Sequence, residues 1–400
     1  MIPGKLNIVT DAMHGSTGKG LITTAIADKH KPEVLSTTNM ANAGHTAVDT
    51  NGAAFVAKAL PSAAALVKWR PGYKPAIFVG ASAAFHLEQI VKEMNETESG
   101  ELVCIHPRAG VITDTHRQRE CTNNPDSTKH IASTMQGCGL ALADKIMRLS
   151  DVKLASDYQE LSQYIFKPTW TRMSVIHQDT SISDTFKDKC DYSCESMPEY
   201  LDCVLRMNNT ILHEGAQGFS LDINHGQSYP YCTSRGTTAI TNLADMGLSP
   251  RHLGDIYLVL RPFPIRVGNV VEGGIRAGYS GDCYHDQKEL SWEEVAFSSG
   301  MPEEYAKILT DKERTTVTKR IRRVFSFSFE QLKQAVLVNG ATKIALNFAN
   351  YIDWSCYASS SKDSLTPKIK EFINKIEEKV GIPVALVGTG PQYDHVIDLS

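Results

Sequence analysis

Hydrophobic and polar positions divide the chain into short apolar runs and longer stretches with helical spacing. The short, strand-like runs lie at residues 6–10, 76–80, 211–214, 255–260, 343–347 and 383–388. Stretches in which apolar residues recur with helical spacing separate several of them, at 21–29, 82–95, 139–149 and 367–380. Strands that alternate with helices in this way predict an α/β protein with a large, mostly parallel central sheet flanked by helices.

The length of 400 residues allows one large domain with insertions, and we expect a single domain over 1–400. Residues 150–206 are polar and weakly patterned, which predicts a helical or irregular insertion. No apolar run approaches the ~20 residues of a membrane helix, and residues 1–6 show no signal-peptide core. The net charge of −4 gives no general attraction for nucleic acid or an anionic membrane. We therefore expect a cytoplasmic protein with neither partner.

The nine cysteines are mostly scattered, with one cluster at Cys190, Cys194 and Cys203. The cluster lacks the paired Cys-x-x-Cys spacing of common zinc sites, so ordinary reduced thiols are favoured over a metal site. Reduced thiols agree with a cytoplasmic location.

A glycine-rich segment, Gly15-Ser16-Thr17-Gly18-Lys19-Gly20, follows the first strand-like run and opens a helix. In that context successive backbone N–H groups and the positive end of the helix bind a phosphate, and Lys19 adds a full charge. The spacing is shorter than in a Walker A loop, and Gly20 stands where Ser or Thr would bind magnesium. Taken alone, the segment also fits a tight glycine turn with a solvated lysine.

Two further polar segments change this picture. Residues 39–46 read Asn-Met-Ala-Asn-Ala-Gly-His-Thr, and residues 213–219 read His-Glu-Gly-Ala-Gln-Gly-Phe. With the glycine-rich segment they resemble the signature segments of the adenylosuccinate synthetase family. Further matches lie at 133–145, 233–238, 317–323 and 388–391, in the order of the family. The resemblance spans nearly the whole chain and implies the P-loop-NTPase-like adenylosuccinate synthetase fold with insertions.

The resemblance also implies a reaction, the ligation of aspartate to C6 of a 6-oxopurine nucleotide. A nucleoside triphosphate first phosphorylates O6, because oxide is a very poor leaving group, and the aspartate amine then displaces phosphate. Positioning and charge stabilisation dominate such phosphoryl transfer. The catalytic residues implied are Ser16, Lys19, His45 and Gln217, with His45 at the γ-phosphate. Mg²⁺ is the implied cofactor, at Ser16 and the carbonyl of Gly44.

Three binding regions carry over from the family, residue by residue. The residues implied to bind the purine monophosphate are Ser16, Asn42, Ser133, Thr134, Arg148, Gln217 and Thr233. Aspartate falls to Thr316, Val317, Thr318, Arg320 and Arg322, in a basic run that continues to Arg323 and suits a dicarboxylate. The triphosphate falls to Gly15, Ser16, Thr17, Gly18, Lys19, Gly20, His45, Thr46, Arg322, Asn347, Asn350, Gly388, Thr389, Gly390 and Pro391. Arg148 matches an arginine that reaches the partner's active site in the family, which implies a homodimer; the alternative is a solvated helix arginine.

The chain departs from the family at position 16, where the usual aspartate serves as base and magnesium ligand. Here it is Ser16, a very weak base, and Thr17 replaces a glutamate. A bacteriophage subgroup with this change acts on dGMP in the synthesis of 2-aminoadenine nucleotides, and a short neutral residue leaves room for the 2-amino group. We therefore expect dGMP as substrate. A slow or degenerate synthetase, or an ordinary one using IMP and GTP, is the alternative. A non-catalytic nucleotide-binding protein is disfavoured because Lys19, His45 and Gln217 are present.

The guanine-reading Thr/Asn-Lys-x-Asp motif of the family is also altered. The matching residues are Asn347-Phe348-Ala349-Asn350. Asn350 both donates and accepts hydrogen bonds, so it suits adenine and predicts ATP or dATP as phosphate donor. A loop shift that brings Asp353 to the base is the alternative. Asp11, just ahead of the glycine-rich segment, is a candidate for recovering part of the lost base function.

Overall fold

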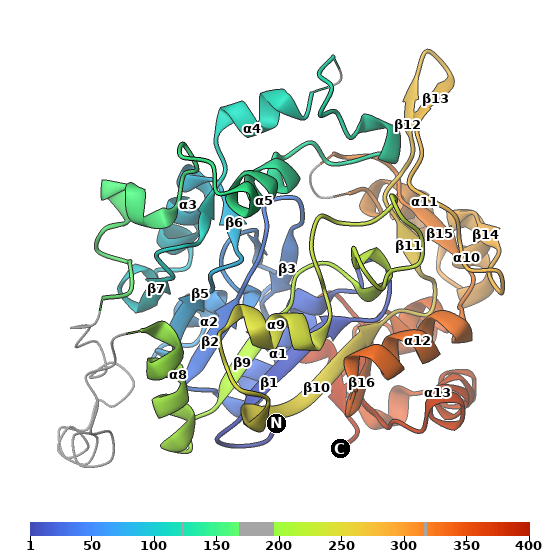
Figure 1. The fold of residues 1–400 in the computed structure, drawn as a ribbon. Coiled ribbons are helices and arrows are strands. Elements are labelled where there is room, and N and C mark those ends of the chain that lie inside the picture. Colours follow the sequence, from blue (N-terminus) through green and yellow to red (C-terminus); the bar gives the residue numbers. More distant parts are fainter. Residues whose placement is uncertain (122, 168–195, 316–317) are drawn as a thin grey trace.

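The computed structural model describes residues 1–121, 123–167, 196–315 and 318–400. Its centre is a nine-stranded sheet (Figure 1). From edge to edge the strands are β18 (Val396–Asp398), β17 (Val384–Gly388), β16 (Lys343–Leu346), β10 (Leu253–Leu260), β1 (Leu6–Asp11), β9 (Ile211–Glu214), β2 (Val34–Thr37), β5 (Ala76–Val79) and β7 (Val103–Ile105). Neighbouring strands are parallel except β17 and β18, which pair antiparallel.

Helices lie around the large sheet and the smaller sheets. They are α1 (Lys19–His30), α2 (Leu66–Trp69), α3 (Leu87–Glu96), α4 (Asp114–Arg119), α5 (Cys138–Met147), α8 (Met197–Arg206), α9 (Ala239–Asp245), α10 (Trp292–Ser299), α11 (Glu303–Lys312), α12 (Phe329–Asn339) and α13 (Pro367–Val380). On β1, Val9 packs into the core on the α1 face, whereas Leu6 and Ile8 pack with α8 and α9 on the other. Every residue of β1 is buried, as expected of a central parallel strand.

Four small sheets lie outside the large one. They are β11 (Ile265–Arg266) with β15 (Arg323–Phe325) and β14 (Glu289–Leu290), β12 (Val270–Glu272) with β13 (Ile275–Gly278), β3 (His45–Val48) with β4 (Ala54–Ala57), and β6 (Ala84–Phe85) with β8 (Gly110–Val111). The β12–β13 hairpin projects from the body of the molecule (Figure 1). Among the described residues, no helix is long and apolar enough to cross a bilayer.

The predicted α/β class with a large, mostly parallel sheet is confirmed. The helix predicted at 367–380 has the predicted bounds, because Thr366 caps its first turn, Pro367 begins it, and Gly381 ends it with φ +69°. The stretch predicted as helix at 82–95 becomes helical only at Leu87, because Ala84 and Phe85 pair with β8.

The region from 150 to 206 is described only in part. It contains two 3₁₀ turns, at Ala155–Asp157 and Gln159–Leu161, and α8, so its reading as an insertion stays a prediction. Cys203 of α8 is disulfide-bonded, which corrects the expectation of a reduced thiol there. Cys190 and Cys194 lie outside the described residues.

Candidate active site

The predicted site segments meet at the carboxyl-terminal end of the parallel strands, because each follows the last residue of one strand. The glycine-rich loop follows β1, residues 39–44 follow β2, residues 215–219 follow β9, Asn347 follows β16, and Gly388 ends β17. Ligand sites of open α/β sheets form at the carboxyl ends of the strands. The fold thus brings together segments from both ends of the chain.

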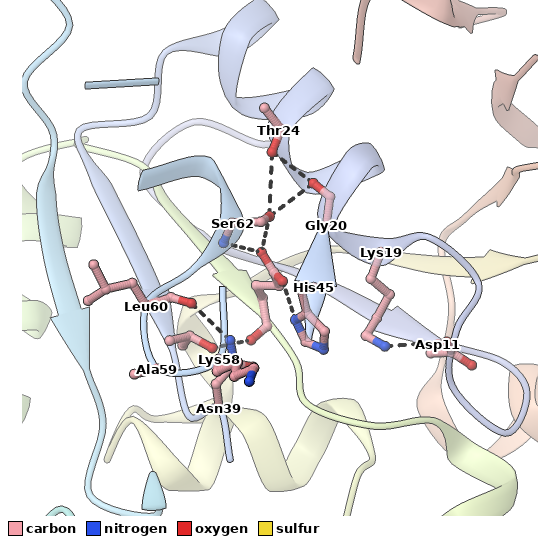
Figure 2. Close-up of polar contacts among 12 residues, drawn as sticks. Asp11, Lys19, Gly20, Thr24, Asn39, His45, Lys58, Ala59, Leu60 and Ser62 are labelled. Atoms are coloured by element: carbon pink, nitrogen blue, oxygen red, sulfur yellow. Dashed lines mark hydrogen bonds and ion pairs between the residues drawn. The ribbon is translucent and has the colours of Figure 1, made fainter. Parts of the chain in front are cut away.

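Asp11 bonds to several groups in and just before residues 15–20, which we call the phosphate loop after their predicted role. Its carboxylate is fully buried and accepts the backbone N–H groups of Met13 at 2.7 Å and Gly15 at 3.3 Å. The other oxygen accepts the Thr17 hydroxyl at 2.5 Å. It also lies 3.3 Å from Lys19 Nζ (Figure 2). Asp11 therefore fixes the loop and pairs with its lysine. It has no free face toward a substrate, so it serves as a scaffold and not as the missing base.

Most of this loop is buried, Lys19 at 4% exposure included, whereas Ser16 is exposed. Gly18 precedes α1 with φ +78° and makes no side-chain cap, so the N–H groups of the first turn keep their positive field. A Cβ at Gly18 would lie 2.1 Å from Asn347 Nδ2, which explains the glycine. Ser16 sits at the loop tip with φ +56° and an exposed side chain. The serine is therefore available to a ligand.

His45 is held by a buried carboxylate from β9. Its Nδ1 bonds to Glu214, whose second oxygen accepts the backbone N–H of Ser62 at 2.9 Å and its hydroxyl at 2.5 Å. Ser62 lies 2.9 Å from the carbonyl of Gly20, which connects the network to the phosphate loop (Figure 2). Because Glu214 accepts from Nδ1–H, Nε2 is the ring nitrogen that remains to contact a ligand.

The charge of Glu214 is stabilised in place. Burial alone raises the pKa of the carboxyl group, but His45 and Ser62 outweigh it, and the pKa of Glu214 is lowered below its ordinary value.

A second buried carboxylate, Glu93, accepts the N–H groups of Lys58, Ala59 and Leu60 at 2.8, 3.0 and 2.9 Å. The carbonyl of Leu60 in turn accepts from Asn39 at 2.9 Å. These bonds fix the backbone of residues 58–60, just before Ser62 (Figure 2).

The predicted monophosphate residues form two groups. Gln217 Nε2 donates to Asn42 Oδ1 at 3.0 Å, so these two adjoin. Ser133 donates to Glu120 at 2.9 Å, and Glu120 also accepts the N–H of Gly137 at 2.6 Å. The remaining positions follow: Thr134 is half-buried, Thr233 is buried, and Arg148 lies exposed at the end of α5.

The predicted aspartate residues lie beside the monophosphate segment. Arg320 Nη2 donates to the carbonyls of Ala132 and Ser133 at 2.8 and 3.0 Å, and its Nε donates to Thr318 at 3.0 Å. Arg322 pairs with Glu313 at 3.1 Å. Within the described ranges, Nη1 of Arg320 and Nε of Arg322 are buried without a hydrogen-bond partner, which suits an anionic ligand. Thr316 and Val317 lie outside the described residues.

Arg323 has a different role from its neighbours. It makes a double ion pair with Glu289, at 2.7 Å from each carboxylate oxygen, and donates to the carbonyl of Gly281 at 2.7 Å. These contacts tie β15 to β14 and occupy the guanidinium. The basic run therefore offers two arginines, Arg320 and Arg322, to a dicarboxylate.

The predicted base-reading segment adjoins the phosphate loop. Asn347 Nδ2 donates to the carbonyl of Thr17 at 3.1 Å, so its amide holds the loop. Asn350 is 5% exposed, in the 3₁₀ turn Ala349–Tyr351. Asp353 Oδ1 accepts the N–H and hydroxyl of Ser355 at 3.1 and 2.8 Å. A base-reading role for Asp353 stays the alternative.

Residues 388–391 complete this corner of the site. A Cβ at Gly388 would meet Asn347 Oδ1 at 2.0 Å, and the Thr389 hydroxyl donates to the carbonyl of Ser359 at 2.6 Å. Gly390 lies close to His395, Pro391 is exposed, and Thr46 is exposed on β3, whose backbone packs on Gly20.

Comparison with known proteins identifies the family of this chain. The model of the adenylosuccinate synthetase family matches residues 8–356. The chain belongs to this family. The adenylosuccinate synthetase of Thermococcus onnurineus is 32% identical over 98% of this chain and 97% of its own. The N6-succino-2-amino-2'-deoxyadenylate synthase of Salmonella phage PMBT28 is 35% identical over 87% of this chain and 86% of its own.

A solved structure adds to the comparison. The succinoaminodeoxyadenylate synthetase of cyanophage S-2L, bound to dGMP and to dATP as energy donor, is 28% identical to this chain. It aligns with a TM-score of 0.72 over 98% of this chain and 95% of its own. The adenylosuccinate synthetase fold is thus shared, and this chain is a ligase that forms a C–N bond.

A magnesium site in this protein would draw on few protein oxygens. The Ser16 hydroxyl and the Gly44 carbonyl are hard donors that fit Mg²⁺, which is usually held by few protein ligands and by substrate phosphates. In the part of the chain that the structure describes, no group of three or more His, Cys, Asp and Glu side chains is placed to hold a metal. The bound ion would neutralise phosphate charge.

Sequence reasoning missed several residues that build the site. Ser62, Glu93, Arg261 and Glu313 carry no motif, and their roles arise from contacts with distant segments. Glu214 lay within a recognised segment but was not singled out. The signal that could have found it is a carboxylate at the end of a buried strand, since such groups need a partner.

His213, beside Glu214, makes stability depend on pH. Its ring is fully buried with Nδ1 3.0 Å from Ser36 Oγ, and burial, with Arg235 nearby, lowers the pKa of His213 to about 3. The unfolded residue titrates near ~6.5, so between these values the unfolded state binds the extra proton and stability falls as pH falls, by ~1 kcal/mol per pH unit.

We expect His213→Gln to flatten this decline. Urea unfolding at pH 7.5 and 5.5 measures it, with the exposed His225→Gln as control. Equal declines in the wild type and His213→Gln would contradict the assignment.

Proposed function

We propose that this enzyme condenses dGMP with L-aspartate, using ATP or dATP and Mg²⁺, to give 2-amino-2'-deoxyadenylosuccinate. In the first step the purine loses its N1 proton, O6 bonds to the γ-phosphorus, and the bond from the γ-phosphorus to the nucleoside diphosphate breaks. In the second, the aspartate amine bonds to C6 and loses a proton, the C6–O6 bond breaks, and phosphate leaves. A cytoplasmic location remains a prediction.

The observation that carries the choice of purine is Ser16. Its exposed side chain at the loop tip is short and neutral, and Asp11, the carboxylate nearest in the loop, is fully engaged below it. The space and charge at the tip thus suit a purine with a 2-amino group. The phage synthases similar to this chain, and the cyanophage enzyme bound to dGMP and dATP, support the same reading.

The protein residues share the phosphoryl transfer. Lys19 and the N–H groups at the start of α1 would bind the γ-phosphate, and His45 would donate from Nε2 to its oxygens as charge develops. Glu214 would keep that tautomer. Gln217 would orient the purine, and Arg320 and Arg322 would bind the carboxylates of aspartate.

A substrate matrix tests the proposal. Purified enzyme receives dGMP, GMP or IMP with ATP, dATP or GTP, together with magnesium and aspartate, and succinylated products are measured by mass spectrometry. We expect product from dGMP with ATP or dATP. Product from IMP with GTP, and none from dGMP, would favour the runner-up, an ordinary adenylosuccinate synthetase.

The choice of donor rests on Asn350. An asparagine amide can pair with the adenine edge, whereas a carboxylate accepts from N1–H and the 2-amino group of guanine. We expect Asn350→Asp to shift the ratio of kcat/KM for ATP to that for GTP toward GTP by ~10–100-fold, the worth of one hydrogen bond to a charged group. Asp353→Asn is the matched control. A shift in that control alone would assign base reading to Asp353.

The proposed homodimer rests on the surface around Arg148. This exposed arginine ends α5 with φ +57°, and three exposed apolar residues flank it: Ile146 at 75%, Met147 at 67% and Leu149 at 44%. Contiguous exposed apolar residues favour an interface.

Two variants separate assembly from binding at this surface. We expect Met147→Glu to give monomers by light scattering, and Arg148→Ala to remain dimeric with KM for dGMP raised ~tenfold. Arg148→Ala mixed with a His45 variant should regain activity if the arginine acts across the interface. A fully active monomer would contradict the proposal.

A further inference from the structure

Arg261 is a buried arginine that no part of the proposed chemistry uses. It follows β10 directly, beside β1, and is 1% exposed. Its Nη1 donates to the carbonyl of Ser16 at 3.2 Å, and its Nη2 pairs with Glu313 at 2.9 Å. The guanidinium carbon lies 4.2 Å from the ring centre of Phe348. One side chain therefore touches three separate segments.

Each of these segments belongs to a different binding region. Ser16 is the tip of the phosphate loop. Glu313 lies just before residues 316–322, the predicted aspartate-binding segment, which we call the aspartate loop. It also accepts from Arg322 at 3.1 Å and from the Tyr351 hydroxyl at 3.0 Å. Phe348 lies between Asn347 and Asn350 in the base-reading segment, and a Cβ on Gly18 would lie 3.2 Å from its ring. A shift of one segment thus acts on the other two through Arg261.

The electrostatics favour a positioning role over one in stability. Arg261 and Glu313 are both buried, and removing such a pair from water costs free energy that their attraction only partly returns. Burial raises the pKa of Glu313, but Arg261 and Arg322 reverse this and lower the pKa. The carboxylate therefore stays charged and holds both arginines.

We propose that Arg261, with Glu313, is a positioning residue that couples the nucleotide-donor site, which it contacts at Phe348 and at the Ser16 carbonyl, to the aspartate site. Donor binding at Phe348 and Asn350 orients Arg261, which orients Glu313 and with it Arg322 in the aspartate loop. This inference rests on the proposed function for the assignment of the two sites. Lysine could not replace the arginine, because an ammonium cannot lie flat on Phe348 while donating to two fixed acceptors.

Binding linkage tests the proposal without turnover. Calorimetry gives the Kd of AMP-PNP with and without aspartate, in the presence of dGMP and magnesium. We expect aspartate to tighten AMP-PNP binding at least ~5-fold in the wild type, the lower end of ordinary coupling. We expect that ratio to approach one in Arg261→Lys and in Glu313→Gln, which keeps the size of the side chain if the arginine variant fails to fold.

The control is Arg70→Lys. Arg70 also pairs with a carboxylate, Asp28 at 2.8 Å, and lies 5.4 Å from an aromatic ring, Tyr393, but at the far end of α1 from the phosphate loop. Its ratio should equal that of the wild type. A wild type without coupling, or Arg261→Lys and Glu313→Gln with unchanged coupling, would overturn the inference. Repeating the titrations with GMP-PNP and IMP separates this result from a wrong choice of donor or purine, since coupling with that pair would uphold the inference while the proposed function fails.

Discussion

Replacing His45 by asparagine should lower kcat by ~10²–10⁴, the usual contribution of a positioned acid or charge-stabilising histidine. The imidazole is 8% exposed and is held by Glu214, which Ser62 connects to Gly20. Steady-state rates of phosphate release with saturating substrates measure the loss.

The matched control is His30→Asn, at the opposite end of α1 from the phosphate loop. It should keep the wild-type rate. Glu214→Gln should lower kcat by a smaller factor, ~10²-fold, because the amide no longer enforces the Nδ1–H tautomer. If His45→Asn kept its rate, the phosphoryl group would have to bind elsewhere.

Replacing Ser16 by aspartate should lower kcat/KM for dGMP relative to IMP by ~10–100-fold, because a longer, charged side chain at the loop tip crowds the 2-amino group and must lose its hydration there. Aspartate tolerates the left-handed backbone that Ser16 adopts at φ +56°, so the loop itself should persist. Competition between the two nucleotides, read by mass spectrometry, gives the ratio directly.

Ser16→Asn separates size from charge in this experiment. It is isosteric with aspartate and also tolerates positive φ. A loss of dGMP selectivity in both variants would point to size, and a loss in the aspartate variant alone would point to charge. Unchanged selectivity in both would move the specificity determinant away from position 16.

The order of strands and helices could be read from the sequence where local signals were complete. Helix α13 carries its own cap, first-turn proline and terminal glycine, and the apolar run of β9 is buried on both faces. β2, at Val34–Thr37, was not predicted. Its place in the sheet depends on β5 and β9, which local patterns do not encode.

The site was predictable only where a segment has a signature of its own. The phosphate loop and the His45 and Gln217 segments do. Arg261 and Glu313 are 52 residues apart and read as ordinary surface charges, since such residues are rarely buried. Asn347 was predicted at the donor, and its side chain lies against the loop carbonyl of Thr17.

The position of β1 in the sheet has a consequence for biosynthesis. Leu6 pairs with Ile211 on one side and with Leu253 on the other, so β1 is synthesised about 200 residues before either of its neighbours. Contacts of such long sequence separation form slowly, and an unpaired apolar strand is prone to aggregate. The nascent protein therefore carries its phosphate loop unassembled until β9 and β10 have been synthesised. We expect truncated products that end before β10 to be insoluble, and the yield of active enzyme to depend on chaperones that shield β1 until its neighbours emerge.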